Sequence, residues 1–322
     1  MTAVLDEKAF QTLKAEVDAW VRGPGEDFAE QIEATGSVPP ELFADLKARG
    51  FLGLAAPERL GGKEIPFTRY LELMEIFSRS HASIRMLVHV INGTWRSMDD
   101  FATDAQREEI IKPSVSGDLL VAFTLTEANA GTGADIRSSV RREGDTYYLS
   151  GEKHLITFGV NCDYWLLAAR LEGTTGHEGT VALLVPNTGL PGAEVIDDSQ
   201  TMGVRGTDHA ILHFDNTPVP VANRLGEEGE GLTVTLGGFL LPSRVSVAMS
   251  CVGLAERAQE LALEYANERV TFGKQGFSND CILSSFVNRN CIHLISLDEL
   301  SQSCSSVILD ITKKITEFQF KE

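Results

Sequence analysis

The sequence predicts an α+β protein with an N-terminal helical domain at residues 1–118, a middle antiparallel β domain at 119–226 and the beginning of a C-terminal helical bundle at 227–274. The spacing of apolar residues supports this prediction. It is typical of helices in the first third and again from Gly229, whereas short runs of β-branched and aromatic residues begin near Leu119. The chain of 322 residues is 43% hydrophobic and 23% charged, which suits a globular protein with sizeable cores.

Five helices are predicted in the first domain, at 5–21, 41–49, 67–79, 83–97 and 104–115. The first has one apolar stripe at helical spacing and is expected to end at the GPG segment 23–25, because glycine and proline interrupt helices. Pro39 and Pro40 open the second helix, and Gly50 follows its last residue, as is typical of helix ends.

The middle domain is predicted to contain five strands, at 120–126, 146–149, 164–169, 180–185 and 210–214. Gly144-Asp145 and Ser150-Gly151 are the expected turns between them. Because no helical pattern separates the strands, an antiparallel sheet or a small barrel is predicted rather than a parallel sheet. The sequence contains no GxGxxG motif, so a dinucleotide-binding Rossmann fold is not supported.

A long amphipathic helix is predicted at 243–268, with Pro242 in its first turn or at a kink. The composition then changes abruptly. Residues 276–322 contain no alanine, a single glycine, and three of the five cysteines. The tail at 275–322 is therefore interpreted as atypical, either fused or frameshifted, and is expected to pack poorly.

Charge and cysteine content exclude several classes of protein. The net charge of −18 argues against nucleic-acid binding. The five cysteines form no CxxC pair, which favours reduced thiols over disulfides or zinc. The N-terminus lacks the pattern of a secretory signal, and the longest uninterrupted apolar runs are too short to span a bilayer. A cytoplasmic location without membrane attachment is expected.

Two segments have the pattern of a site for a planar ligand: residues 123–132 (FTLTEANAGT) and 151–157 (GEKHLIT). Small residues let a backbone approach a flat ring closely, and hydrogen-bond donors at the edge of a flavin tune its acceptance of hydride. Taken alone, the first segment also fits a plain glycine turn, and the second an ordinary hairpin strand.

Together with three further segments, these two resemble the acyl-CoA dehydrogenase family over about residues 1–274. The further segments are 202–209 (MGVRGTDH), 241–244 (LPSR) and 268–274 (ERVTFGK). The resemblance implies FAD as cofactor, an acyl-CoA thioester as substrate, and an electron-transfer flavoprotein or another acceptor as partner. It also implies a homo-oligomer in the full-length family and a role in fatty acid metabolism.

The resemblance also assigns roles to individual residues. Expected FAD contacts are Phe123, Leu125, Thr126, Gly131, Thr132, Leu155, Ile156, Thr157, Arg269, Thr271 and Phe272. Expected substrate contacts are Thr132, Leu241, Ser243 and Arg244. Within the cofactor set, Thr157 is expected to donate towards flavin N5, and the segment around Arg269 to reach the FAD of a neighbouring subunit. His209 and His213 share a strand face but have no further ligand at a suitable spacing, so no metal site is predicted.

The general base expected from the resemblance is missing. Family members place a glutamate either in the distal C-terminal bundle, near a YEGT-like motif, or at the position matching Ser243. The chain has no YEGT-like string, and a serine hydroxyl is too weak a base to replace a carboxylate. Impaired α,β-dehydrogenation of an acyl-CoA is therefore predicted. The alternatives are a non-catalytic acyl-CoA or flavin-binding remnant, a flavin monooxygenase on the same fold, and a purely structural product.

Overall fold

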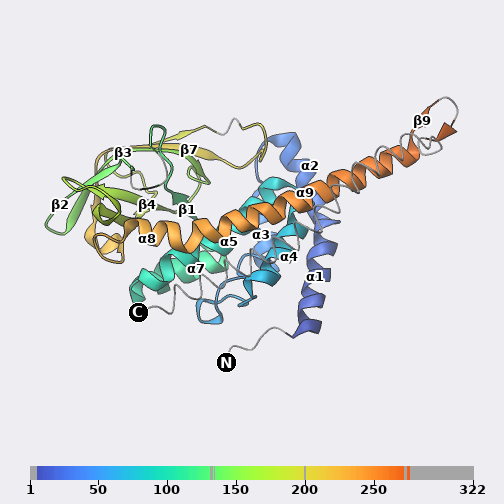
Figure 1. Cartoon of the computed structure of the whole chain (residues 1–322), viewed down its shortest axis with the longest axis horizontal. Helices are drawn as coiled ribbons and strands as arrows, with labels where there is room; N and C mark the ends of the chain where they lie inside the picture. Colours follow the sequence, from blue (N-terminus) through green and yellow to red (C-terminus); the bar gives the residue numbers. More distant parts are fainter. Residues whose placement is uncertain (1–5, 131–132, 134, 199–200, 272–273, 276–322) are drawn as a thin grey trace. The chain divides into compact units, whose positions relative to one another are not determined.

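The computed structural model describes residues 6–130, 133, 135–198, 201–271, 274 and 275 (Figure 1). The chain forms two compact units, at residues 1–254 and 255–322. The first unit begins with helices, continues into a β-sheet and ends in the first half of a long helix. This order confirms the predicted α+β fold class. The predicted atypical tail lies outside the described residues, apart from Gln275.

All five predicted N-terminal helices are present, and a further helix, α2, was not predicted. The helices are α1 (Glu7–Val21), α2 (Pro24–Thr35), α3 (Pro40–Ala48), α4 (Phe67–Ser78), α5 (Ala82–Met98), α6 (Asp104–Gln106) and α7 (Lys112–Ser116), with the π-helical turn η3 (Arg107–Ile111) joining the last two. Pro24 begins α2 because proline is tolerated in the first helical turn, where the backbone N–H has no partner in the helix. The GPG segment therefore ends one helix and starts the next.

The helical part packs around a buried aromatic cluster. The ring centroids of Trp20 and Phe77 lie 5.8 Å apart, and those of Phe51 and Phe77 lie 5.4 Å apart, both in edge-to-face arrangements. All three rings are almost completely buried. Such pairs stabilise a core beyond the burial of their area, and here they join α1, α4 and the segment after α3.

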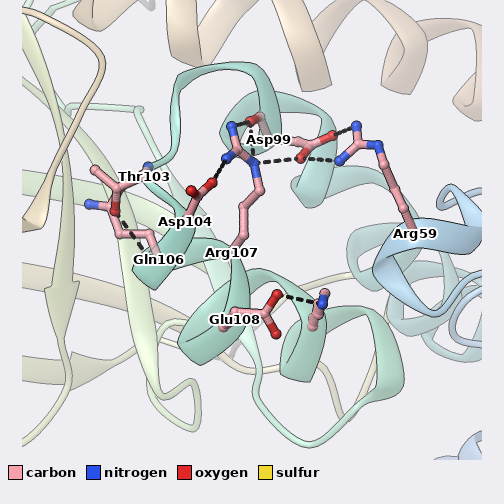
Figure 2. Close-up of polar contacts among 8 residues, drawn as sticks. Arg59, Asp99, Thr103, Asp104, Gln106, Arg107 and Glu108 are labelled. Atoms are coloured by element: carbon pink, nitrogen blue, oxygen red, sulfur yellow. Dashed lines mark hydrogen bonds and ion pairs between the residues drawn. The ribbon is translucent and has the colours of Figure 1, made fainter.

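A buried carboxylate holds the end of α5 (Figure 2). Asp99 is 4% exposed and lies between two guanidinium groups: Arg59 Nη1 donates to Asp99 Oδ1 at 2.9 Å, and Arg107 Nη2 donates to the Asp99 carbonyl at 2.9 Å. The next helix begins with a capping box, in which the side chains of Thr103 and Gln106 each accept a backbone N–H of the other residue. These contacts fix the turn that leads from α5 towards the sheet.

The sheet has eight strands in the order β6-β7-β3-β2-β4-β5-β8, with β1 also paired to β4. The strands are β1 (Val121–Thr124), β2 (Ser139–Glu143), β3 (Thr146–Thr157), β4 (Tyr164–Leu171), β5 (Thr180–Pro186), β6 (Ala193–Asp197), β7 (His209–Pro220) and β8 (Arg224–Leu225). The sheet is mixed rather than wholly antiparallel, because β1 and β2 both pair parallel to β4. Two parallel strands must be joined by a long connection, which is often a helix. Between the parallel strands β1 and β4, the chain instead forms the β2–β3 hairpin.

One predicted turn is confirmed and the other is wrong. Gly144 and Asp145 form the tight turn between β2 and β3, whereas β3 continues through Ser150 and Gly151. Gly151 has a φ of +140° at a register shift against β7, so it forms an irregularity inside a strand instead of a turn. Strands β2, β6 and β8 were not predicted.

The long helix begins earlier than predicted. It runs through α8 (Gly231–Thr235), the π-helical turn η6 (Leu236–Leu240) and α9 (Leu241–Glu268). Pro242 is the second residue of α9, one residue beyond η6, where the wider turn accommodates a residue that has no N–H for the helical ladder. The predicted end at Glu268 is confirmed, and in the second unit a two-stranded hairpin follows, formed by β9 (Val270–Thr271) and β10 (Lys274–Gln275).

By length and composition, the helix at 231–268 could cross a membrane, and it is the one helix in the described part of the chain that could do so. The sequence expectation considered only uninterrupted apolar runs, so it predicted this helix but did not count it as a candidate span, because Gly, Ser and charged residues interrupt its apolar residues. A core helix of a soluble protein has the same composition. In α9, Ser246 and Ser250 are buried and hydrogen-bonded within the first unit, as in a helix packed against protein.

Candidate functional site

The structure brings the first two motif segments together. The Thr126 carbonyl, just after β1, accepts a hydrogen bond from the His154 N–H in β3 at 2.8 Å. The Leu125 carbonyl accepts from Lys153 Nζ at 3.2 Å. Segments that are separated in the sequence therefore form one continuous surface at the end of β1, as a shared ligand site requires.

A buried ion pair fastens these segments to each other. Lys153 Nζ lies 2.8 Å from Glu127 Oε1, and the side chains are 0% and 5% exposed. The ammonium group also donates to the Ala168 carbonyl at 2.8 Å, while Glu127 accepts from the N–H groups of Arg137 at 2.6 Å and Ser138 at 3.0 Å. Every charged atom of the pair is therefore matched by a partner in the surrounding backbone or in the opposite side chain.

The electrostatics of Glu127 argue against a role as general base. Burial raises the pKa of its carboxyl group, but the charge and hydrogen bond of Lys153 outweigh burial and hold the pKa below its usual value. A low pKa and full hydrogen bonding make a poor proton acceptor. Glu127 instead shapes the loop that carries Thr126.

The side chains expected to hold a flavin divide into exposed and buried groups. The hydroxyls of Thr126 and Thr157 are partly exposed, and neither has a hydrogen-bond partner in the described part of the chain. Leu155 is 56% exposed and has a left-handed backbone with a φ of +54°. Strain of this kind is typical of functional sites. Leu125 and Ile156 are buried at 1% exposure, so they support the loop and the strand from behind.

An aromatic chain connects this surface to the long helix. The ring of Phe123, in β1, lies 4.8 Å from that of Phe239, in η6. Phe239 in turn stacks on His89, in α5, at 5.6 Å. A Cβ atom on Gly93 would meet the Phe239 ring at 2.6 Å, so only glycine at this position lets η6 approach α5 so closely.

His89 lies at the centre of a hydrogen-bond network that includes Ser243. Its Nε2 lies 3.0 Å from Ser243 Oγ, while its Nδ1 lies 3.0 Å from the Tyr70 hydroxyl and 3.1 Å from Ser246 Oγ. Ser246 Oγ accepts from Arg85, which leaves its own proton for Nδ1. We therefore assign Nδ1 as the acceptor and Nε2 as the donor to Ser243.

His89 is kept neutral. Burial lowers the pKa of its imidazole well below the usual value, and the positive charges of Arg85 and Arg96 lower it further. Because Nε2 already carries its proton and donates it to Ser243, His89 cannot accept a proton through that serine. The network therefore does not supply a general base at Ser243.

Sequence reasoning placed Ser243 in the site but missed Tyr70, Arg85, His89 and Phe239. Arg85 and His89 are one turn apart in a predicted helix, so they share a face. Two basic side chains on one face of a helix that is largely buried were an available signal. The partner helix could not have been identified, because Ser243 and His89 are 154 residues apart.

The other predicted site residues are more scattered. Leu241 and Arg244 are exposed on α9. In the second unit, the Arg269 guanidinium lies over the Tyr265 ring at 5.7 Å, and the backbone of Thr271 belongs to β9. Gly131, Thr132 and Phe272 lie outside the described residues.

The third motif segment and the histidine pair are also placed. Asp208 joins the segment 202–209 to the end of β3, where its carbonyl accepts from the Phe158 N–H at 2.9 Å and its Oδ1 from the Val160 N–H at 2.8 Å. His213 Nδ1 lies 3.2 Å from a carboxylate oxygen of Glu152. Among the described residues, no group of His, Cys, Asp and Glu side chains could hold a metal ion.

The residues present fit a flavin. Two threonine hydroxyls that have no hydrogen-bond partner among the described residues are available for the polar edge of a ring, and the exposed side chain of Leu155 offers an apolar contact for a ring face. Glu127 and Lys153 hold the backbone between these groups rigidly. Rigid support of this kind is what a site for a planar, hydrogen-bonded cofactor requires.

Comparison with known proteins identifies the family. Three family models match: the acyl-CoA dehydrogenase N-terminal domain at residues 7–118, the middle domain at 122–217 and the C-terminal domain at 229–291. The last match extends past Lys274, so the likeness reaches further along the chain than the motifs indicated.

Individual proteins agree with the family models. An acyl-CoA dehydrogenase of Bacillus subtilis is 32% identical over 79% of this chain and 67% of its own length. A short-chain-specific acyl-CoA dehydrogenase of Megasphaera elsdenii is 32% identical over 74% of this chain and 63% of its own length. The solved butyryl-CoA dehydrogenase of Megasphaera elsdenii is 27% identical, with a TM-score of 0.75, over 85% of this chain and 75% of its own. The chain thus spans about two thirds of the length of these curated relatives, and it belongs to the acyl-CoA dehydrogenase family.

Proposed function

We propose that this chain is a FAD-dependent, acyl-CoA dehydrogenase-type oxidoreductase that binds an acyl-CoA thioester and is impaired in α,β-dehydrogenation. The observation that carries the proposal is the junction of the segments 123–127 and 151–157, which places Thr126, Leu155 and Thr157 on connected backbone. Membership of the family supports the enzyme class.

We expect separate groups of residues to bind the flavin and the thioester. Thr126 and Thr157 would donate to the polar edge of the flavin, and Leu155 would pack on its ring. When bound, FAD would supply an acceptor for the hydride of the substrate's β-carbon. Leu241, Ser243 and Arg244 on α9 would contact the thioester, with His89 orienting the Ser243 hydroxyl through its Nε2 proton.

The impairment follows from the chemistry at position 243. Removal of a proton next to a thioester carbonyl needs a base whose pKa is near the working pH. Ser243 offers a hydroxyl that already accepts a hydrogen bond from a neutral imidazole. Among the described residues of the segment 123–132, Glu127 is the one with a carboxylate, and that carboxylate forms an ion pair with Lys153.

We expect the double variant Thr126→Ala, Thr157→Ala to retain less FAD or to show a shifted flavin reduction potential. Each lost hydrogen bond corresponds to about 0.5–1.5 kcal/mol, so FAD affinity should fall by roughly fivefold to a hundredfold. Flavin absorbance per mole of purified protein measures retention. The matched control is Thr175→Ala, Thr188→Ala, which alters two exposed threonines outside the motif segments. Unchanged flavin content and potential in the first variant would contradict the placement.

One alternative function has specific support. A non-catalytic acyl-CoA or flavin-binding remnant is favoured by the neutral His89–Ser243 pair at the expected base position. Anaerobic addition of an acyl-CoA to the flavin-loaded protein separates the two: bleaching of the flavin indicates dehydrogenation, and a spectral shift without bleaching indicates binding alone. A protein that holds no flavin would contradict the proposed cofactor.

The remaining features of the proposal concern the cellular setting. The electron acceptor is an electron-transfer flavoprotein or another oxidant, the chain associates with copies of itself, and it acts in fatty acid metabolism in the cytoplasm. Reduced thiols support the cytoplasmic location, since Cys162 and Cys251 are both free. Cell fractionation and sedimentation of the purified protein test location and assembly.

A further inference from the structure

Phe158, directly after Thr157 at the end of β3, has a left-handed backbone. Its φ is +59°, which is uncommon for any residue except glycine and is an outlier for a bulky side chain. Glycine, asparagine and aspartate adopt this conformation most readily, and phenylalanine has neither the freedom of glycine nor a polar group that bonds to its own backbone. Contacts with distant parts of the chain must therefore hold Phe158 in this conformation.

The aromatic side chain of Phe158 makes the first of these contacts. It is 4% exposed and belongs to the hydrophobic core of the N-terminal helices, although the residue itself comes from the sheet. Among the described residues, every other buried member of that core lies within positions 10–91. Burial of the ring offsets the strain of the backbone, so the ring anchors the end of β3 in the helical core.

Backbone hydrogen bonds hold the same turn from the other side. The Phe158 N–H donates to the Asp208 carbonyl at 2.9 Å, and the Val160 N–H donates to Asp208 Oδ1 at 2.8 Å. The Gly159 N–H donates back to the Ile156 carbonyl at 2.9 Å, which closes the turn. A Cβ atom on Gly159 would lie 2.8 Å from that carbonyl oxygen, so the turn is tight enough to require glycine there.

Thr157 consequently lies between two left-handed residues. Leu155 has a φ of +54°, and the pairing of β3 with β7 shifts register between Lys153 and Ile156. The Thr157 hydroxyl is partly exposed and has no hydrogen-bond partner among the described residues. Because the backbone is fixed on both sides of Thr157, a change of conformation at Phe158 moves this hydroxyl.

We propose that Phe158 is a positioning residue for the flavin: its ring, anchored in the helical core, holds the left-handed backbone that aims the Thr157 hydroxyl at the flavin ring. This inference rests on the proposed function, because it takes Thr157 to donate to the flavin. Phe158 acts through Thr157 alone and has no contact of its own with the cofactor. Hydrogen bonds weaken steeply when they are misaligned, and those to the ring nitrogens tune how readily a flavin accepts hydride. The backbone at Phe158 therefore sets the reduction potential.

The test compares Phe158→Ile with Phe158→Leu in the full-length, flavin-loaded protein. The two new side chains are isomers, and both keep an apolar group in the helical core. Isoleucine branches at Cβ, which strongly disfavours a left-handed backbone, whereas leucine does not. In the isoleucine variant we expect the flavin midpoint potential to shift in the same direction as in Thr157→Ala. FAD affinity should also fall about twofold to tenfold, as for the loss of one hydrogen bond. The leucine variant should keep the potential and the affinity of the parent.

A double-mutant cycle tests whether Phe158 acts through Thr157. In a Thr157→Ala background, Phe158→Ile should cause no further shift of the potential, because the hydroxyl that it misplaces is already absent. Additive shifts would overturn the inference. Phe10→Leu, which changes a phenylalanine of the same core on α1, is the control for lost aromatic packing. It should lower the melting temperature and leave the potential unchanged.

Phe158→Gly provides a second variant that avoids the crowding of a branched side chain. Glycine removes the anchor, so the hydroxyl should lose its fixed position and the potential should shift as in Thr157→Ala. An unchanged potential in both the isoleucine and the glycine variants, with a lower melting temperature, would show a purely structural role. That result would overturn the inference and leave the proposed function intact. A parent protein that binds no FAD would overturn the proposed function, and the inference with it.

Discussion

Replacing Lys153 by methionine is expected to lower the free energy of unfolding by about 3–5 kcal/mol, because it leaves the Glu127 carboxylate buried without its counter-ion. Lys153 is completely buried, and its ammonium group has three hydrogen-bond acceptors: the Leu125 and Ala168 carbonyls and Glu127 Oε1. All three acceptors belong to buried residues. Urea denaturation of the purified variant measures the change.

The matched control for this prediction is Lys14→Met. Lys14 Nζ lies 2.8 Å from Glu72, the same distance as in the Lys153–Glu127 pair, but its side chain is 37% exposed. We expect a loss below about 1 kcal/mol, because water replaces a surface partner at little cost. Adding Glu127→Gln to Lys153→Met should restore part of the stability by removing the unpaired charge. Equal losses for the Lys14 and Lys153 variants would contradict the structural role of the buried pair.

Replacing Ser243 by glutamate is expected to create or raise dehydrogenase activity by about 10²–10⁴-fold, the usual contribution of a well-placed general base. The substitution places a carboxylate on α9 at the position where some family members have theirs. The positive charges of Arg85 and Arg96, which act on His89 beside Ser243, favour the ionised form of this carboxylate. Anaerobic mixing of the flavin-loaded variant with valeryl-CoA, followed by flavin absorbance, measures the effect as bleaching.

Ser243→Gln is the matched control, because glutamine has the size and polarity of glutamate without its basicity. The glutamine variant and the parent protein should leave the flavin oxidised. Bleaching by both variants at the same rate would show that the side chain at position 243 does not act as the base. Rapid turnover by the parent protein would indicate a base outside the described residues.

The sequence alone was sufficient for the fold class and for the segments that bear the site. Apolar periodicity located five N-terminal helices, and the motifs at 123–132 and 151–157 indicated the two segments that the structure brings together at the proposed flavin site. These properties depend on local patterns, which each stretch of chain contains by itself. Helix α2 and strands β2, β6 and β8 were missed because short elements with charged residues or an initial proline have weak local patterns.

The tertiary structure decided which of these segments meet and what their side chains can do. The hydrogen bond from the His154 N–H in β3 to the Thr126 carbonyl just after β1 accompanies the contact of Glu127 with Lys153, 26 residues away, in a buried ion pair. The packing of α5 against the long helix places His89 beside Ser243 and leaves Arg85 buried without a carboxylate. Sequence patterns determine which face of an element is apolar, but burial, pairing and the resulting pKa shifts depend on contacts between distant residues, and only the folded chain makes those contacts.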